Sequence, residues 1–203
     1  MRKYFKIAAV VSGLTLLAAP VLADYKTGLG AYRVRDYKRA MKEFKADPTR
    51  DSQFNLGVMY FKGEGVKADP IEGIEWFRKA AEKGHVQAQF LLGTMFDAGK
   101  DVAQDRAAAA KWYLKAADQG HVQAQFNLGL MYTNGEGVEK DREKAVVWLK
   151  KAAGNGHRDA GRLLKTMGEE VPAQAQHKGG KVTKKAPAGS APSTLPPGHP
   201  PQQ

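Results

Sequence analysis

Hydrophobic and polar positions in the middle of the chain follow a helical spacing. From Ser52 to Lys62, apolar residues recur at steps of three and four, which is the pattern of an amphipathic helix. The segment 63–65 then carries two glycines, which readily take the positive φ of a helix C-cap. Asp69 and the proline after it form an N-cap and a first helical position, and a second apolar pattern continues to Lys83. The segment therefore predicts a helix–turn–helix unit.

This unit occurs three times. Trp76, Trp112 and Trp148 are each separated by 36 residues. A fixed period of about 20–50 residues marks an array in which one supersecondary unit stacks on copies of itself. We expect the tryptophans to lie on the buried face of the second helix of each unit, where core packing is favoured over ligand stacking. The predicted structural core consists of Leu56, Gly57, Tyr60, Trp76, Leu92, Gly93, Trp112, Leu128, Gly129, Tyr132 and Trp148.

The sequence around this array divides into further segments. Residues 24–51 read as a degenerate partial repeat, with Phe44 near the tryptophan position, and 52–171 as the repeat array with a last partial repeat after His157. Residues 172–203 are rich in proline, lysine and glycine and hold no aromatic residue, so we expect a disordered tail. In the second repeat, Asp101 replaces a turn glycine, and aspartate enters the left-handed region more readily than most residues.

The recurring residues resemble the Sel-1-like repeat family, a branch of α/α solenoids related to tetratricopeptide repeats. The shared elements are the Ala-x-x-x-Leu-Gly-x-x-Tyr helix, the Gly-x-Gly-Val turn, an aspartate cap, the tryptophan, and an alanine pair followed by glycine. The resemblance implies an all-α, right-handed α/α solenoid of three 36-residue repeats with partial repeats at both ends. It also implies a non-catalytic scaffold that binds a protein or peptide on its concave surface. The alternative function is an envelope-associated factor in virulence, secretion or cell-wall contact.

The concave surface of tetratricopeptide-type stacks is formed by the first helix of each pair. Asn55 and Asn127 occupy the same position in repeats one and three, where an amide side chain can hold a partner's backbone. Solvated polar residues without a partner explain them equally well. The predicted partner-binding residues are Asn55, Val58, Lys62, Gln87, Leu91, Thr94, Gln123, Asn127 and Leu130.

Candidate chemistry in the sequence is sparse. His85, His121 and His157 are each separated by one repeat, too far for a single zinc ion with ligands at about 2 Å. We therefore place them in the inter-repeat turns and predict no metal site and no cofactor. The glycine-rich turns lack the lysine of a phosphate loop and follow a helix rather than a strand. We expect no enzymatic activity, and an enzyme with an unrecognised site is the less favoured alternative.

The first 23 residues have the pattern of a secretory signal peptide. Three basic residues precede an apolar stretch from Ile7 to Leu17, and Pro20 and a small-residue cleavage site follow it. The stretch is shorter than the roughly 20 residues of a membrane-spanning helix, so export is favoured over a membrane anchor. We predict cleavage after Ala23 and a periplasmic or secreted protein of the Gram-negative type. The sequence contains no cysteine, which suits an oxidising compartment.

The net charge of +11 is unevenly distributed. The first 23 residues contribute +3 and residues 172–203 contribute +4, so the repeat array is only mildly basic. We therefore expect a protein or peptide partner and no nucleic acid. The lysines of the tail either keep a linker soluble, the favoured interpretation, or make weak contact with anionic envelope components.

Overall fold

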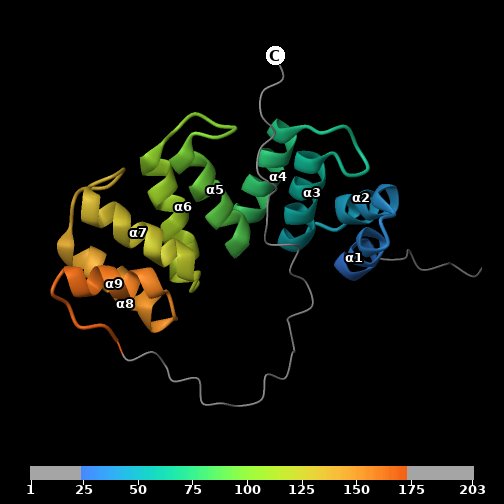
Figure 1. Ribbon diagram of the computed structural model, residues 1–203. Helices are drawn as coiled ribbons and strands as arrows, with labels where there is room; N and C mark the ends of the chain where they lie inside the picture. Colours follow the sequence, from blue (N-terminus) through green and yellow to red (C-terminus); the bar gives the residue numbers. More distant parts are fainter. Residues whose placement is uncertain (1–23, 173–203) are drawn as a thin grey trace, which may run out of the picture.

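The protein folds into helices arranged in successive pairs. The computed structural model describes residues 24–172, and within that range it contains helices and no strand. The helices follow one another along an arc from α1 to α9 (Figure 1), which confirms the predicted all-α solenoid. The predicted signal peptide and all but the first residue of the predicted tail lie outside the described residues. The helices are α1 (Tyr25–Arg33), α2 (Tyr37–Ala46), α3 (Arg50–Lys62), α4 (Pro70–Glu82), α5 (Val86–Ala98), α6 (Arg106–Asp118), α7 (Val122–Asn134), α8 (Arg142–Gly154) and α9 (Arg158–Thr166).

Each helix begins at a residue whose side chain caps it. Asp69, Asp105 and Asp141 accept hydrogen bonds from backbone N–H groups three residues on, at 3.1, 2.9 and 2.9 Å. These bonds satisfy donors that the first turn of a helix otherwise leaves free. The first helix of each repeat ends at a left-handed glycine, for example Gly63 with φ 73°. Asp101 takes the left-handed conformation predicted for it, with φ 64°. The predicted helix boundaries therefore follow from local capping chemistry.

The two helices of a repeat meet where a glycine of the first helix faces a large side chain of the second. A Cβ placed on Gly57 would lie 2.5 Å from the ring of Phe77, and one on Gly93 would lie 2.6 Å from the ring of Tyr113. Gly129 faces Leu149 in the same way at 2.8 Å. The facing residues are almost wholly buried, which shows that the three glycines permit close helix contact.

The tryptophans occupy a different position from the one predicted. Trp148 is 8% exposed, but Trp76 and Trp112 are only half-buried. The fully buried position is the next residue along the helix, as in Phe77. Each indole instead reaches the preceding repeat, and Trp148 packs among the alanines of α6. The prediction that all three tryptophans are buried core residues was therefore wrong for two of them, because the adjacent residue, Phe77 or Tyr113, occupies the fully buried position on the helix.

Two other predicted core positions, Tyr60 and Tyr132, are also half-buried. Ile71, an apolar residue at the start of α4, is 76% exposed. The leucines and glycines of the predicted core are buried. They are Leu56, Gly57, Leu92, Gly93, Leu128 and Gly129.

The N-terminal unit is a helix pair. Helix α1 packs against α2, and a Cβ on Gly28 would lie 2.6 Å from the ring of Phe44. Phe44 therefore corresponds to Phe77, whereas the sequence pattern had placed it near the tryptophan position. The unit reproduces the glycine–aromatic contact of the full repeats at the start of the stack.

Buried glutamines connect consecutive repeats. Gln89 donates to the carbonyl oxygen of Ala81 at 2.9 Å and accepts from Gln119 at 2.7 Å. Gln125 donates to the carbonyl oxygen of Ala117 at 3.1 Å and accepts from Asn155 at 3.2 Å. Both glutamines are 4% exposed, and the partners satisfy the polar atoms that burial removes from water. These amides fix the stacking of one repeat on the next.

The helical glycines give a testable prediction. Alanine at Gly57 gains helix propensity worth about 1 kcal/mol, but it overpacks a site closed by Phe77 and by the carbonyl oxygen of Gly73 at 3.0 Å. We expect Gly57→Ala to destabilise the protein by a net ~1–3 kcal/mol in urea unfolding. Gly30 in α1 has no atom within 4 Å of a Cβ, so Gly30→Ala should be neutral or stabilising. Equal effects of the two substitutions would refute the close-contact interpretation.

None of the helices within residues 24–172 is long and apolar enough to cross a membrane.

Candidate functional site

The first helices of the second and third repeats expose a surface without charged residues. In α5 the only charged residue is Asp97, close to its C-terminal end, and α7 has none. The whole chain is 26% charged, so two successive helices of this kind stand out. Asp97 lies 3.8 Å from Arg106. The exposed or half-buried residues at steps of four and three are Gln87, Leu91 and Thr94 on α5, and Gln123, Asn127 and Leu130 on α7.

Tyr113 of α6 forms hydrogen bonds with residues of both α5 and α7. Its ring is buried, and its hydroxyl donates to Thr94 Oγ1 at 3.5 Å. Burial raises the pKa of Tyr113, and hydrogen bonds with Thr94 and Asn127 oppose that shift. Gln123 in turn donates to Asn127 Oδ1 at 2.9 Å. The structure therefore brings predicted residues of both helices into one polar group. Sequence reasoning missed Tyr113. The signal that could have revealed it is a polar hydroxyl at the position that Phe77 and Leu149 occupy in the other repeats.

The first repeat contributes less than predicted. Asn55 is 2% exposed, and its amide donates to the carbonyl oxygen of Asp51 at 2.8 Å. Burial raises the pKa of Tyr25 in α1, and a hydrogen bond with Asn55 opposes that shift. Val58 is 8% exposed and Lys62 is half-buried at the end of α3. Asn55 and Val58 are therefore removed from the candidate surface, because the N-terminal helix and the core cover them.

The histidines lie in the inter-repeat turns, and each caps the helix that follows. Nδ1 of His85, His121 and His157 accepts a backbone N–H bond at 3.1, 3.2 and 3.3 Å. Each imidazole also stacks on a phenylalanine from the first helix of the preceding repeat, with ring centroids 4.1–4.3 Å apart. Among the described residues, no group of three or more histidines and carboxylates is placed to hold a metal ion. The histidines thus have a defined structural role as caps.

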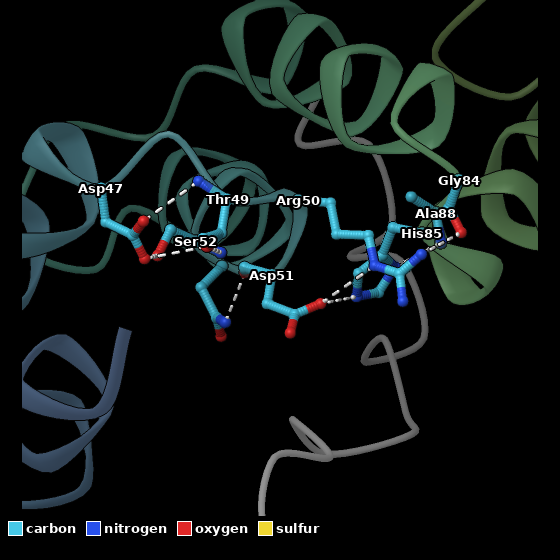
Figure 2. Close-up of polar contacts among 9 residues, drawn as sticks. Asp47, Thr49, Arg50, Asp51, Ser52, Gly84, His85 and Ala88 are labelled. Atoms are coloured by element: carbon cyan, nitrogen blue, oxygen red, sulfur yellow. Dashed lines mark hydrogen bonds and ion pairs between the residues drawn. The ribbon is translucent and has the colours of Figure 1, made fainter. Parts of the chain in front are cut away.

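One joint gathers serine, histidine and aspartate side chains, as Figure 2 shows. Ser52 is fully buried and donates to Asp47 at 2.6 Å, and Thr49 donates to the same carboxylate at 2.8 Å. Nε2 of His85 instead lies 3.6 Å from Asp51. A serine nucleophile needs a histidine base in contact with its hydroxyl. The hydroxyl here bonds a carboxylate and is closed to solvent, so the cluster serves to cap α3 and join it to α5.

The histidine caps predict acid sensitivity. Burial lowers the pKa of His85 and His121 below the ordinary value of 6.5. Asp51 opposes the shift at His85 and Arg50 reinforces it. Because the folded-state pKa is below the unfolded value, these groups stabilise the fold fully above about pH 6.5, and the stabilisation is lost as pH falls through the folded-state pKa. Protonation also removes the Nδ1 acceptor.

We therefore expect the urea midpoint to fall as the pH is lowered from 7.5 towards 5, a range above the ordinary titration of carboxylates. Asparagine caps helices without titrating. The double variant His85→Asn with His121→Asn should lose less stability over the same range. An identical decrease in both proteins would contradict the assignment to these histidines.

Comparison with known proteins places the repeat array in a family. The family model of the Sel1 repeat matches residues 50–85, 86–121 and 122–157. These three consecutive matches cover more than half of the chain, and the chain belongs to the Sel1 repeat family. Sel1 repeat proteins generally serve as scaffolds for protein–protein interaction and are typically non-catalytic.

Solved structures show the same architecture. A Sel1 repeat protein from Oxalobacter formigenes is 36% identical, with a TM-score of 0.67 over 70% of this chain and 43% of that one. The protein c5321, described as a protective antigen of uropathogenic Escherichia coli with an SLR fold, is 40% identical, with a TM-score of 0.55 over 62% of this chain and 27% of that one. The matched region thus spans less than half of the length of each of these two solved proteins. The comparison with curated protein sequences gives no match.

Proposed function

We propose that this protein is a non-catalytic scaffold that binds a segment of a partner protein along α5 and α7. The observation that carries the proposal is the uncharged surface of these two helices in a chain rich in lysine and arginine. Depletion of charge is the compositional signature of the centre of protein interfaces. Membership of the Sel1 family supports the same function.

The chemistry of this surface favours an extended, uncharged peptide segment. Leu91 and Leu130 offer half-exposed apolar contacts, one from each repeat. Gln87, Thr94 and Asn127 lie beside them and supply amide and hydroxyl groups for a partner's backbone. From the family resemblance, we expect this face of the protein to be concave, so that a segment crossing it contacts both repeats at once.

The proposal includes a location outside the cytoplasm. Its support is the basic start, apolar stretch and small-residue cleavage site of the first 23 residues. The mass of the protein purified from its native host tests this part. A mature chain that begins at Asp24 and is released with the periplasmic or secreted fraction is expected, whereas an intact N-terminus in the cytoplasmic fraction would overturn it.

The binding surface is tested by charge introduced at its centre. Leu91→Arg with Leu130→Arg places two cations on an otherwise neutral face, and we expect binding of the co-purified partner to fall at least tenfold. Ile71→Arg is the matched control because Ile71 is 76% exposed on α4. It should retain binding. A partner held equally well by both variants would exclude α5 and α7 as its site.

A further inference from the structure

A second surface feature lies on α6, the second helix of the middle repeat. A shallow hollow of about 350 Å³ is lined by five residues of α6. Leu114 at its edge is 38% exposed, and Trp112 is half-buried. Small alanines at the start of α6 leave this space open. The lining residues are Ala108, Lys111, Trp112, Leu114 and Lys115.

The lysine at one side of the hollow belongs to a repeated contact. The ammonium group of Lys115 lies 4.2 Å from the centre of the Trp112 ring. Lys79 lies 4.0 Å from Trp76, and Lys151 lies 3.8 Å from Trp148. Attraction between a cation and the face of an indole holds each ammonium group near the helix surface. The three repeats therefore present one positioned lysine each.

The charges around that lysine differ between the first and second repeats. Glu72 and Glu75 stand in the first repeat where Ala108 and Lys111 stand in the second. Arg78 pairs with Glu75 at 3.5 Å in the first repeat, and its counterpart in the second is Leu114. Lys79 thus lies beside acids, whereas Lys115 lies beside a second lysine and an apolar surface.

The second helix of the third repeat, α8, carries the same kind of residues. Its Trp148 belongs to the same buried cluster as the alanines of α6. Val147 is 51% exposed, and Lys151 lies four residues further on the same face. Lys144 is neutralised by Asp141 at 2.9 Å, and Lys150 by Glu169 at 3.1 Å. Within residues 24–172, Lys111, Lys115 and Lys151 make no ion pair, and the acids Asp118 and Glu143 lie towards the helix ends.

We propose that this basic patch, made of Lys111, Trp112, Leu114, Lys115, Val147 and Lys151, docks an acidic segment of a protein partner. Three unpaired ammonium groups complement glutamate or aspartate side chains, and charged rims of this kind steer association and fix its register. The hollow on α6 accommodates one apolar side chain of the same segment. A protein segment fits better than an anionic membrane, because it can place acidic side chains beside separate ammonium groups and an apolar side chain over Trp112 and Leu114 at the same time.

The test uses a short fluorescein-labelled peptide of alternating glutamate and leucine, with binding to the purified protein measured by fluorescence anisotropy. The double variant Lys111→Glu with Lys115→Gln recreates the acidic environment of the first repeat at position 111. We expect it to weaken binding by about five- to tenfold and to reduce the dependence of binding on salt.

Lys79→Gln is the matched control, since it removes the same lysine–tryptophan contact from the first repeat. It should change binding by less than about twofold. Both variants keep the lysines of the C-terminal segment. Because the double variant removes three positive charges and Lys79→Gln removes one, the single variant Lys115→Gln is measured beside Lys79→Gln, and the difference between these two isolates the patch. Circular dichroism that matches the parent protein confirms that each variant is folded.

Three results would overturn the proposal. The first is an equal loss in Lys79→Gln and in Lys115→Gln, which would mean that only general positive charge matters. The second is unchanged binding of a peptide with glutamine in place of glutamate. The third is binding of phosphatidylglycerol vesicles through Lys111 and Lys115 without binding of the peptide, which would assign the patch to a membrane surface.

Discussion

Phe77→Ala is expected to destabilise the protein by about 3–5 kcal/mol, the range for removing a fully buried phenylalanine. The ring is 0% exposed and lies between the two helices of the first full repeat. It contacts the Gly57 backbone and lies 5.5 Å from Phe54 and 6.3 Å from Phe61, measured between ring centroids. Its loss leaves a cavity that the closely packed helices cannot fill. Urea unfolding followed by far-ultraviolet circular dichroism measures the change.

The control for this substitution is on the same helix. Ile71→Ala removes a side chain that is 76% exposed, so its effect should stay within about 0.5 kcal/mol. Trp112→Ala should fall between the two, because the ring is half-buried. A loss below about 1 kcal/mol in Phe77→Ala would mean that the helix pair is not held together at this contact.

Gly137→Ala is expected to destabilise the protein by about 2–5 kcal/mol through two separate effects. Gly137 has φ 68°, where a Cβ is disfavoured. An added Cβ would also overlap the carbonyl group of Arg106 at the start of α6, and that backbone is held by the preceding repeat. The glycine therefore lets the turn of the third repeat lie directly against the second.

Gly120→Ala separates the two effects. Gly120 has φ 86° and no atom within 4 Å of an added Cβ, so alanine there meets only the backbone penalty of about 1–2 kcal/mol. The midpoint of thermal unfolding should be lower for Gly137→Ala than for Gly120→Ala, and the difference measures the overlap of the added Cβ with the neighbouring repeat. Equal midpoints would show that this contact contributes nothing to the stack.

The helix pairs could be predicted because their determinants are local. Aspartate caps, left-handed glycines and apolar steps of three and four act within a few residues of sequence, and Asp101 follows the same rules. Helix α1 was missed because Gly28 and Gly30 lower its helix propensity and its sequence lacks the landmarks of the full repeats. Its glycine–aromatic contact with Phe44 appears only when α2 is placed beside it.

The errors in the core and in the candidate site have two different origins. Trp76 and Phe77 are adjacent on a helix, so periodicity alone does not say which one points at the facing glycine. Asn55 and Asn127 occupy equal positions in the sequence. Helix α1 packs over Asn55, whereas no equivalent helix covers Asn127, which is half-exposed. Repeats that are equivalent in sequence are not equivalent in space at the end of a stack, where the neighbour differs.

The central claim is that a partner protein lies along α5 and α7. The most direct measurement places a photo-crosslinking amino acid at Thr94 in the living cell and analyses the adducts by mass spectrometry. We predict one discrete protein adduct that is lost when Leu130→Arg is added, and none from the same crosslinker at Ile71. Crosslinking from Ile71 with none from Thr94, or a Thr94 adduct that persists with Leu130→Arg, would contradict the claim.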